Sequence, residues 1–218
     1  MHSSRPSPIL FILATLLILA APLFAFDSPL SSQSIREAYF LGQRHDDSYL
    51  DAYTKILAPP RTGPHVSSMQ FLTPFAELTR RSSQHSTGYS AQQAEQDHRN
   101  QPENVTIIIE IQLTDSYGAL IPQPAASRST SGTAYRLRSP DFWRDFDVQV
   151  FQGEKELEPK SLHGQPNYYC SDGACTLRGA TISVHFPASA FDSDSATISV
   201  TPPIGDPVAV DFDLTRLR

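Results

Sequence analysis

The chain has 218 residues, with 17 Lys and Arg against 23 Asp and Glu, which gives a formal net charge of −6. A net acidic chain argues against non-specific binding of nucleic acid, which needs a basic face. Charged residues make up only 18% of the chain and apolar residues 39%, so wholesale disorder is also excluded. A chain of this length can bury one good core, or one core with a small appendage.

Residues 1–25 have the layout of a cleavable secretory signal peptide. Arg5 lies in a short polar start, an uninterrupted apolar run extends from Ile9 to Ala21, and Ala25 offers a small residue at the cleavage point. The run is too short to span roughly 30 Å of hydrocarbon as a helix. Cleavage after Ala25 removes one cation and leaves 193 residues with a net charge of −7. The protein is therefore expected to be periplasmic or secreted, with no membrane span after cleavage. The alternative is a protein tethered to the membrane by an uncleaved N-terminal segment.

Residues 26–63 predict a helical hairpin appendage. Ser34-Ile35-Arg36-Glu37 fits a capping box that would begin the first helix, and Pro59-Pro60 end the second. Apolar residues repeat at helical spacing over residues 34–57. About two dozen residues are too few to be stable alone, so this apolar face should dock on another part of the chain.

Residues 64–103 are predicted to form a connecting segment with a candidate strand and a short helix. Val66 to Leu72 favours a strand, whereas Thr73-Pro74 resembles an N-cap followed by proline at the first helical position. Residues 74–81 therefore stay open between strand and helix. Ser90-Ala91-Gln92-Gln93 has the spacing of a capping box and predicts a helix to about Arg99.

Residues 104–218 predict a β-sandwich domain. The stretch from Asn104 to Leu113 alternates apolar and polar side chains, which makes it the clearest strand in the chain. Residues 119–133 are expected to form a surface loop, or alternatively a binding loop. Further short strands are expected at residues 134–138, 146–150, 168–170, 175–177, 182–186, 198–200 and 208–214. The predicted fold class is thus mainly β, an antiparallel Ig-like β-sandwich preceded by a small helical segment.

The two cysteines, Cys170 and Cys175, flank Asp172-Gly173, a strong hairpin turn signal. Opposed strand positions bring Cα atoms within reach of a disulfide, and an exported chain meets conditions in which disulfides persist. The pair is predicted to staple a hairpin, with a chain-entropy contribution of roughly 2 kcal/mol for so small a loop. The alternative is a redox-active pair, which usually has Cys-x-x-Cys spacing at the start of a helix.

No motif for a catalytic residue, a metal or a cofactor is found. The sequence lacks a nucleophile elbow, a zinc-binding helix, a phosphate-binding loop and a dinucleotide fingerprint. The six histidines outside the signal peptide have no local spacing typical of metal ligands.

Two pairs of adjacent aromatic residues, Phe142-Trp143 and Tyr168-Tyr169, are the candidates for contact with a ligand or partner. Neighbouring strand residues point to opposite faces, so one ring of each pair would be exposed. Exposed rings can stack on sugars or anchor a partner protein. In the alternative interpretation, Trp143 belongs to the core and the other rings shield a sheet edge.

Three hypotheses for function follow. The leading one is an exported, non-catalytic β-sandwich module that binds another protein or an envelope polymer. The second is a carbohydrate-binding module, or an accessory to a hydrolase, that uses the exposed aromatic rings. The third is an extracytoplasmic enzyme whose site is dispersed along the sequence.

Overall fold

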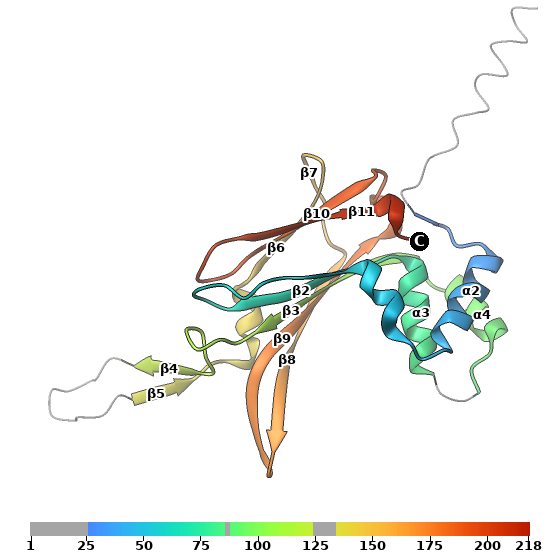
Figure 1. Cartoon of the computed structure of the whole chain (residues 1–218). Coiled ribbons are helices and arrows are strands. Elements are labelled where there is room, and N and C mark those ends of the chain that lie inside the picture. The colour runs from blue at the N-terminus through green and yellow to red at the C-terminus, as the bar shows by residue number, and fades with distance from the viewer. Residues whose placement is uncertain (1–25, 86–87, 124–133) are drawn as a thin grey trace, which may run out of the picture.

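The computed structural model describes residues 26–85, 88–123 and 134–218. The expected signal peptide, residues 1–25, lies outside the described residues. Within them the protein is mainly β, and every pair of neighbouring strands is antiparallel, which confirms the expected architecture at that level. Figure 1 shows two sheets facing each other, a cluster of helices at one end, and two ribbons that project from the other end.

The larger sheet has five strands in the order β1-β2-β3-β9-β8. Its strands are β1 (Thr54–Ile56), β2 (His65–Leu72), β3 (Asn104–Gln112), β9 (Ala174–Pro187) and β8 (Ser161–Ser171). The period-two stretch predicted from Asn104 is the central strand β3. Its neighbour β2 comes from the predicted connecting segment, so the expected boundary at residue 104 falls between two paired strands.

The smaller sheet has four strands in the order β11-β10-β6-β7. These are β11 (Val208–Asp213), β10 (Ser195–Thr201), β6 (Asp147–Gln152) and β7 (Lys155–Glu156). A separate two-stranded sheet pairs β4 (Leu120–Gln123) with β5 (Ala134–Leu137). Because β4 lies inside the stretch 119–133, the expectation of a loop there is wrong for residues 120–123; residues 124–133 lie outside the described residues.

The core lies between the two larger sheets. The face of β3 that points to this core carries the buried side chains of Val105, Ile107, Ile109 and Ile111. Thr106 and Ile108, on the opposite face, are buried as well, so this part of β3 is covered on both sides. Phe71 of β2 meets the smaller sheet directly, since its ring centroid is 5.7 Å from that of Phe212 on β11. Phe191 packs edge-on against Phe71 at 5.1 Å. The two sheets therefore share one core, the arrangement of a β-sandwich.

Three helices form a second, smaller core at one end of the sandwich. They are α2 (Ser32–Gly42), α3 (Pro74–Gln84) and α4 (Ala91–Arg99). Their buried apolar residues are Leu30, Ile35, Ala38, Phe75, Leu78 and Ala94. Gly42 permits the close approach of α2 to α3, because a Cβ atom at this position would lie 2.3 Å from the carbonyl oxygen of Thr79.

The predicted helical hairpin over residues 34–57 is wrong from Thr54 onward, where a strand replaces the helix, and its first helix packs on a different partner. Residues Asp47–Tyr53 form the 3-10 helix η1, and β1 follows at once. The apolar face of α2 packs instead on α3, the segment that the sequence left open. Thr73 caps α3 by accepting from the N–H of Ala76 at 3.3 Å, and Pro74 occupies the first turn as its N-cap pattern indicates.

The first helix begins earlier than the capping box at Ser34 predicts. Ser31 is the N-cap residue, and its hydroxyl accepts from the N–H of Ser34 at 3.0 Å. Glu37 lies within the helix and forms an ion pair with Arg218. The capping box that begins at Ser90 is placed correctly, since the Ser90 hydroxyl accepts from Gln93 N–H at 3.2 Å.

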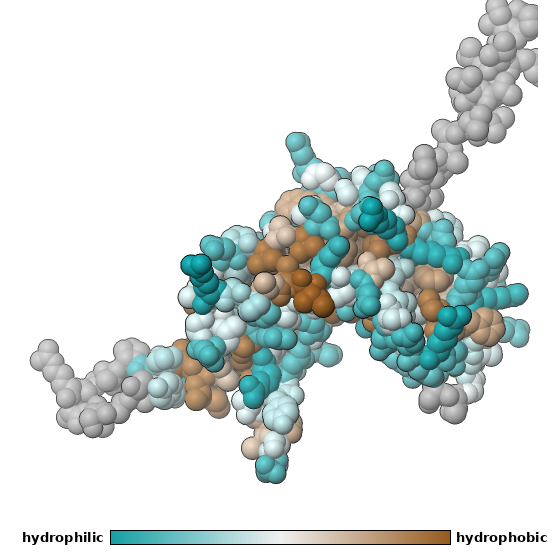
Figure 2. All heavy atoms as spheres, viewed as in Figure 1, coloured by the Kyte–Doolittle hydropathy of each residue, from teal (hydrophilic) through white to brown (hydrophobic). Residues whose placement is uncertain are grey.

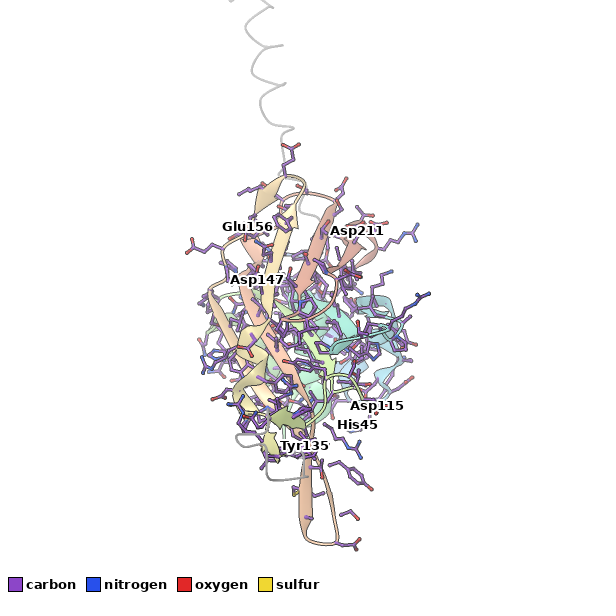
Figure 3. All side chains as sticks on the ribbon, turned by 90° about the vertical axis from the view of Figure 1, so that its left-hand side faces the viewer. His45, Asp115, Tyr135, Asp147, Glu156 and Asp211 are labelled. Atoms are coloured by element: carbon purple, nitrogen blue, oxygen red, sulfur yellow. A yellow bond between two sulfur atoms is a disulfide. The ribbon has the colours of Figure 1, made fainter. Side chains whose placement is uncertain are left out.

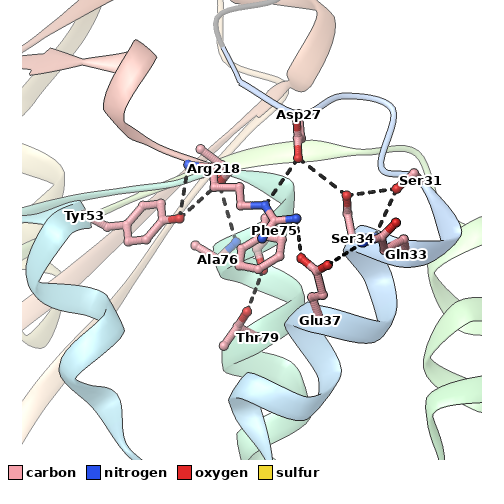
Figure 4. Close-up of polar contacts among 11 residues, drawn as sticks. Asp27, Ser31, Gln33, Ser34, Glu37, Tyr53, Phe75, Ala76, Thr79 and Arg218 are labelled. Atoms are coloured by element: carbon pink, nitrogen blue, oxygen red, sulfur yellow. Dashed lines mark hydrogen bonds and ion pairs between the residues drawn. The ribbon is translucent and has the colours of Figure 1, made fainter.

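Arg218 joins the helical cluster to the sandwich (Figure 4). Its carbonyl oxygen accepts from the hydroxyl of Tyr53 at 3.2 Å and from that of Thr73. Its guanidinium pairs with Asp27 at 3.4 Å and with Glu37 on α2. One residue thus holds together the segment before α2, the helix itself, η1 and the start of α3.

Candidate interaction surface

Two ribbons project from the end of the sandwich opposite the helices. The first, the short ribbon, consists of β4 and β5. The second, the stapled ribbon, consists of residues 168–177, where β8 and β9 extend beyond the end of β3. The last backbone bond between β9 and the chain that follows β3 runs from Leu113 N–H to the carbonyl of Arg178, at 2.8 Å. Figure 3 shows the stapled ribbon extending well past the body.

The tip of the stapled ribbon has the structure that its sequence predicts. Cys170 and Cys175 lie directly opposite each other and form the disulfide. Asp172 and Gly173 both have positive φ, 52° and 78°, as a type I′ hairpin turn requires. Since an isolated two-stranded ribbon is marginally stable in water, the disulfide supplies the constraint that a third strand provides elsewhere in the sheet.

Both tyrosines of the stapled ribbon are exposed. Tyr168 lies opposite Leu177 and Tyr169 lies opposite Thr176, so the two rings project from opposite faces. Their exposed fractions are 50% and 59%. The sequence predicted one exposed ring in the pair, whereas both are exposed. Leu177, opposite Tyr168, is still buried, so the body covers the base of the ribbon but neither tyrosine ring.

The other aromatic pair, Phe142 and Trp143, is buried. Both residues lie in the 3-10 helix η2 (Pro140–Asp145), not on a strand, so the expectation that alternation exposes one ring does not apply. Trp143 is 6% exposed and covers Gly164 of β8, where a Cβ atom would lie 2.1 Å from the ring. The ring centroid of Phe142 lies 6.2 Å from that of Phe146. Neither ring is available at the surface, and the alternative interpretation of Trp143 as a core residue is confirmed.

The short ribbon exposes an apolar face that the sequence analysis missed. Leu120 pairs with Leu137 and Pro122 with Tyr135, and the spacing of two along each strand places all four on one face. Leu137 is 74% exposed and Tyr135 59%. Figure 2 shows hydrophobic side chains gathered where this ribbon leaves the body. Apolar residues do recur at a spacing of two in β4 and in β5, but each strand has only four residues, which is too short a pattern to predict this apolar face from sequence.

A groove separates the two ribbons. Its volume is about 400 Å³, and it is lined by Leu113, Ala119 and Leu120 on one side and by Leu177 and Arg178 on the other. The lining is mixed, since Asp115 and Thr114 also border the groove. The groove makes the apolar face of the short ribbon continuous with the base of the stapled ribbon.

The base of the short ribbon is held firmly. Arg138, just after β5, donates from its backbone N–H to the carbonyl of Ala119 and from Nε to the carbonyl of Gly118, both at 2.8 Å. Its guanidinium lies 3.5 Å above the ring of Tyr117, which is buried. Burial also raises the pKa of Tyr117, so this phenol stays neutral near pH 7.

A second group of polar side chains lies elsewhere, around a cavity of about 130 Å³ between α3, the end of α4, β3 and β9. Glu103 accepts from His98 Nε2 at 2.8 Å, from the hydroxyl of Ser28 at 2.6 Å and from the N–H of Leu30 at 2.6 Å. Burial favours the neutral acid, but these hydrogen bonds together outweigh it and hold the pKa of Glu103 below its ordinary value. The bonds of this carboxylate tie the segment before α2 to the start of β3.

His185 borders the same cavity from β9. Its Nδ1 lies 3.1 Å from the hydroxyl of Thr106. Burial lowers the pKa of His185, so the ring is neutral near pH 7. Sequence spacing could not find this cluster, because two of its members are distant in the chain: Ser28 lies 75 positions from Glu103, and His185 lies 79 positions from Thr106. Among the described residues, no group of three or more His, Cys, Asp or Glu side chains is placed to hold a metal ion.

No helix in the described ranges combines the length and the apolar character needed to cross a bilayer.

Comparison with models of known protein families finds no match. A search of curated proteins finds no significant relative.

Proposed function

We propose that this protein is an exported, Ig-like module that binds another protein through the short ribbon and the stapled ribbon. One observation carries the proposal. The described residues expose nine large apolar side chains, and five of them lie on the two ribbons: Leu120, Tyr135, Leu137, Tyr168 and Tyr169. Of these, Leu120, Tyr135 and Leu137 share one face of the short ribbon, and grouped exposed apolar side chains are typical of interaction sites.

A protein partner fits these ribbons better than a sugar does. Sugar binding by stacking needs a flat aromatic platform, and of the four candidate rings Phe142 and Trp143 are buried. Tyr168 and Tyr169 project from opposite faces of a narrow ribbon, so they do not make a common platform. The leucine side chains that line the groove, Leu113, Leu120 and Leu177, favour apolar contact with a partner chain.

Export agrees with this proposal. The N-terminal 25 residues have the composition of a signal peptide, and the disulfide between Cys170 and Cys175 belongs to an oxidising compartment. The mature protein isolated from the native host is expected to have Phe26 as its first residue. N-terminal sequencing of that material tests the export part of the proposal by itself.

The binding part is tested by affinity capture from the native host with three forms of the protein. The first is unchanged, the second carries Leu120→Asp and Leu137→Asp, and the third carries Ile204→Asp. Ile204 is a matched control because it is 57% exposed and lies on the body, between β10 and β11. Because charge at the ribbon contact must be desolvated on binding, the double variant should lose its partner.

The expected result is one recurring protein recovered with the unchanged form and with Ile204→Asp but absent from the double variant. Recovery of the same proteins by all three forms would contradict the proposal. Binding to a glycan array that is lost on Tyr169→Ala, with partner capture absent, would favour the carbohydrate hypothesis instead.

A further inference from the structure

Among the described residues, each edge strand of the two larger sheets carries a feature that hinders pairing with another strand. In the five-stranded sheet, the edge strand β1 has only three residues, and β8 is interrupted by Pro166. In the four-stranded sheet, β7 has two residues. At the other edge, β11 carries the exposed acidic residues Asp211 and Asp213. Short edges, proline and charge are the devices by which natural sheets avoid unwanted pairing.

The short ribbon has two edges, and only one carries such a feature. β4 contains Pro122, which has no N–H to donate. β5, with the sequence Ala134-Tyr135-Arg136-Leu137, contains no proline, and its one charged residue, Arg136, lies on the face opposite Tyr135 and Leu137. No other strand of the described residues pairs with β5 on the side away from β4. β5 is therefore an open edge among the described residues. The strands of the stapled ribbon also have no third strand beside them, but their two tyrosines lie on opposite faces, whereas β5 places Tyr135 and Leu137 on one face.

The phase of the hydrogen bonds shows which backbone groups this edge presents. Arg138 N–H donates to Ala119, one position beyond the opposed pair Leu120 and Leu137. Leu120 and Leu137 are thus a non-bonded pair, and bonded and non-bonded pairs alternate along an antiparallel ladder. The N–H and C=O groups of Leu137 and of Tyr135 consequently point away from β4, toward solvent.

The same two residues carry the exposed apolar side chains of β5. A strand added at this edge would place every second side chain beside Tyr135 and Leu137, on the apolar face of the ribbon. It would also convert a marginal two-stranded ribbon into a three-stranded sheet with one covered face, which is the minimum for independent stability. The backbone and the side chains of β5 are therefore both suited to one kind of ligand.

We infer that β5 accepts an extended peptide segment of the partner protein as a third strand of the short ribbon. The peptide's alternate apolar side chains cover Tyr135 and Leu137. The size of the site favours a peptide over a second folded copy, because a standard protein interface engages roughly 20–30 residues on each side. Strand addition to an open edge is an established mode of peptide recognition in general. This inference rests on the proposed function and names the chemistry of the partner.

The test begins with a random linear peptide library displayed on phage and selected on the full chain with its disulfide intact. The most enriched peptide is synthesised and titrated by fluorescence anisotropy. Alternating apolar residues are expected in the selected sequences. Leu137→Ala should weaken binding several-fold, and Leu137→Pro, which also removes an outward N–H, should weaken it at least tenfold further. Arg136→Ala is the matched control, because Arg136 points to the other face and its backbone bonds inward to β4, so binding should stay within twofold.

A second measurement leaves the protein unchanged and protects the test against a misfolded Leu137→Pro. The selected peptide is methylated at alternate backbone nitrogens in two forms. One form should bind and the other should lose at least tenfold in affinity, because only one set of N–H groups faces β5.

Three results would overturn strand addition: no enriched peptide, equal binding by Leu137→Ala and Leu137→Pro, or equal binding by the two methylated peptides. A dimer that forms without peptide and is lost in Leu137→Pro would assign the edge to a second copy instead. If host capture remains sensitive to Leu120→Asp with Leu137→Asp but not to Leu137→Pro, the proposed function stands and strand addition fails. If host capture shows no dependence on the ribbons, the proposed function itself fails.

Discussion

Replacement of Gly164 by alanine probes the contact between β8 and η2 more sharply than any other single change. A Cβ atom at this position would lie 2.1, 2.4 and 2.5 Å from three atoms of the Trp143 ring. An ordinary contact between carbon atoms is about 3.5–4.0 Å, so the ring or the strand must shift by about 1 Å or more. Trp143 is 6% exposed and cannot swing into solvent without emptying its site.

The expected loss for Gly164→Ala follows from this overlap. Adding a methyl group to a packed core costs about 1–3 kcal/mol, and the rigidity of both neighbours places the loss at about 2 kcal/mol. For a chain of this size, that corresponds to a fall of roughly 4–8 °C in the melting temperature. Trp143 is the only tryptophan, so its fluorescence during urea unfolding reports on this contact directly.

A double-mutant cycle decides whether the loss arises from the named contact. Trp143→Leu removes the ring that the added methyl group would meet. In that background Gly164→Ala should lower the free energy of unfolding, measured by circular dichroism, by less than about 0.5 kcal/mol. Gly118→Ala is the matched control, since a Cβ atom there meets its nearest heavy atoms at 3.5 and 4.0 Å. Its effect should be neutral or slightly stabilising. The reasoning is refuted if Gly164→Ala costs the same in both backgrounds, or if it costs no more than Gly118→Ala.

Three further predictions concern the disulfide, the Arg218 contacts and one histidine. Replacing Cys170 and Cys175 by alanine removes about 2 kcal/mol of constraint from the stapled ribbon, so amide exchange measured by mass spectrometry should accelerate there and remain unchanged in β3; equal acceleration throughout the chain would contradict this. Arg218→Ala should lower the free energy of unfolding by about 1 kcal/mol or less, because its side chain is half-exposed; a urea series in low and high salt should show the difference shrinking as salt rises, and a salt-independent loss would argue against the ion pairs. Burial lowers the pKa of His185 in the folded chain, so the unfolded chain binds the proton more readily and stability, complete above the ordinary value of 6.5, should decline as the pH falls below it. His185→Asn should reduce this decline in urea titrations across pH 5 to 8, roughly the range in which an ordinary histidine changes charge, and an unchanged pH profile would count against it.

Elements fixed by local chemistry could be predicted from the sequence. The alternation in β3, the Asp172-Gly173 turn with its flanking cysteines, and the cap at Ser90 each depend on residues within about ten positions of one another. These local preferences agree with the tertiary contacts of the same residues, so the folded structure keeps the elements that they predict.

Choices between local alternatives could not be predicted. Ser31 and Ser34 are both good N-cap residues, and the position of the helix relative to α3 decides between them. Residues 47–53 have helical spacing, yet they form a 3-10 helix that brings Tyr53 into the core, and β1 follows at once beside β2. In each case a contact with a distant segment selects the outcome.

The candidate surface was predicted only in part. Tyr168 and Tyr169 follow from an aromatic pair beside a hairpin signal, whereas Leu120 and Leu137 become a surface only when β4 and β5 pair. The sequence alone could not show whether Trp143 is exposed or buried. Its ring packs on Gly164 of β8, twenty-one positions later, and that contact is not visible from local sequence. The spatial grouping of side chains depends on pairings that a single sequence does not specify.

The continuous strand β9 has a mechanical consequence. It begins at the disulfide-closed tip and continues through the body, where nine of its residues pair with β3. A tension applied to the tip along the strand direction would load these pairings in shear, all together, instead of peeling them open one after another. Tension on the stapled ribbon would therefore have to break all nine pairings at once.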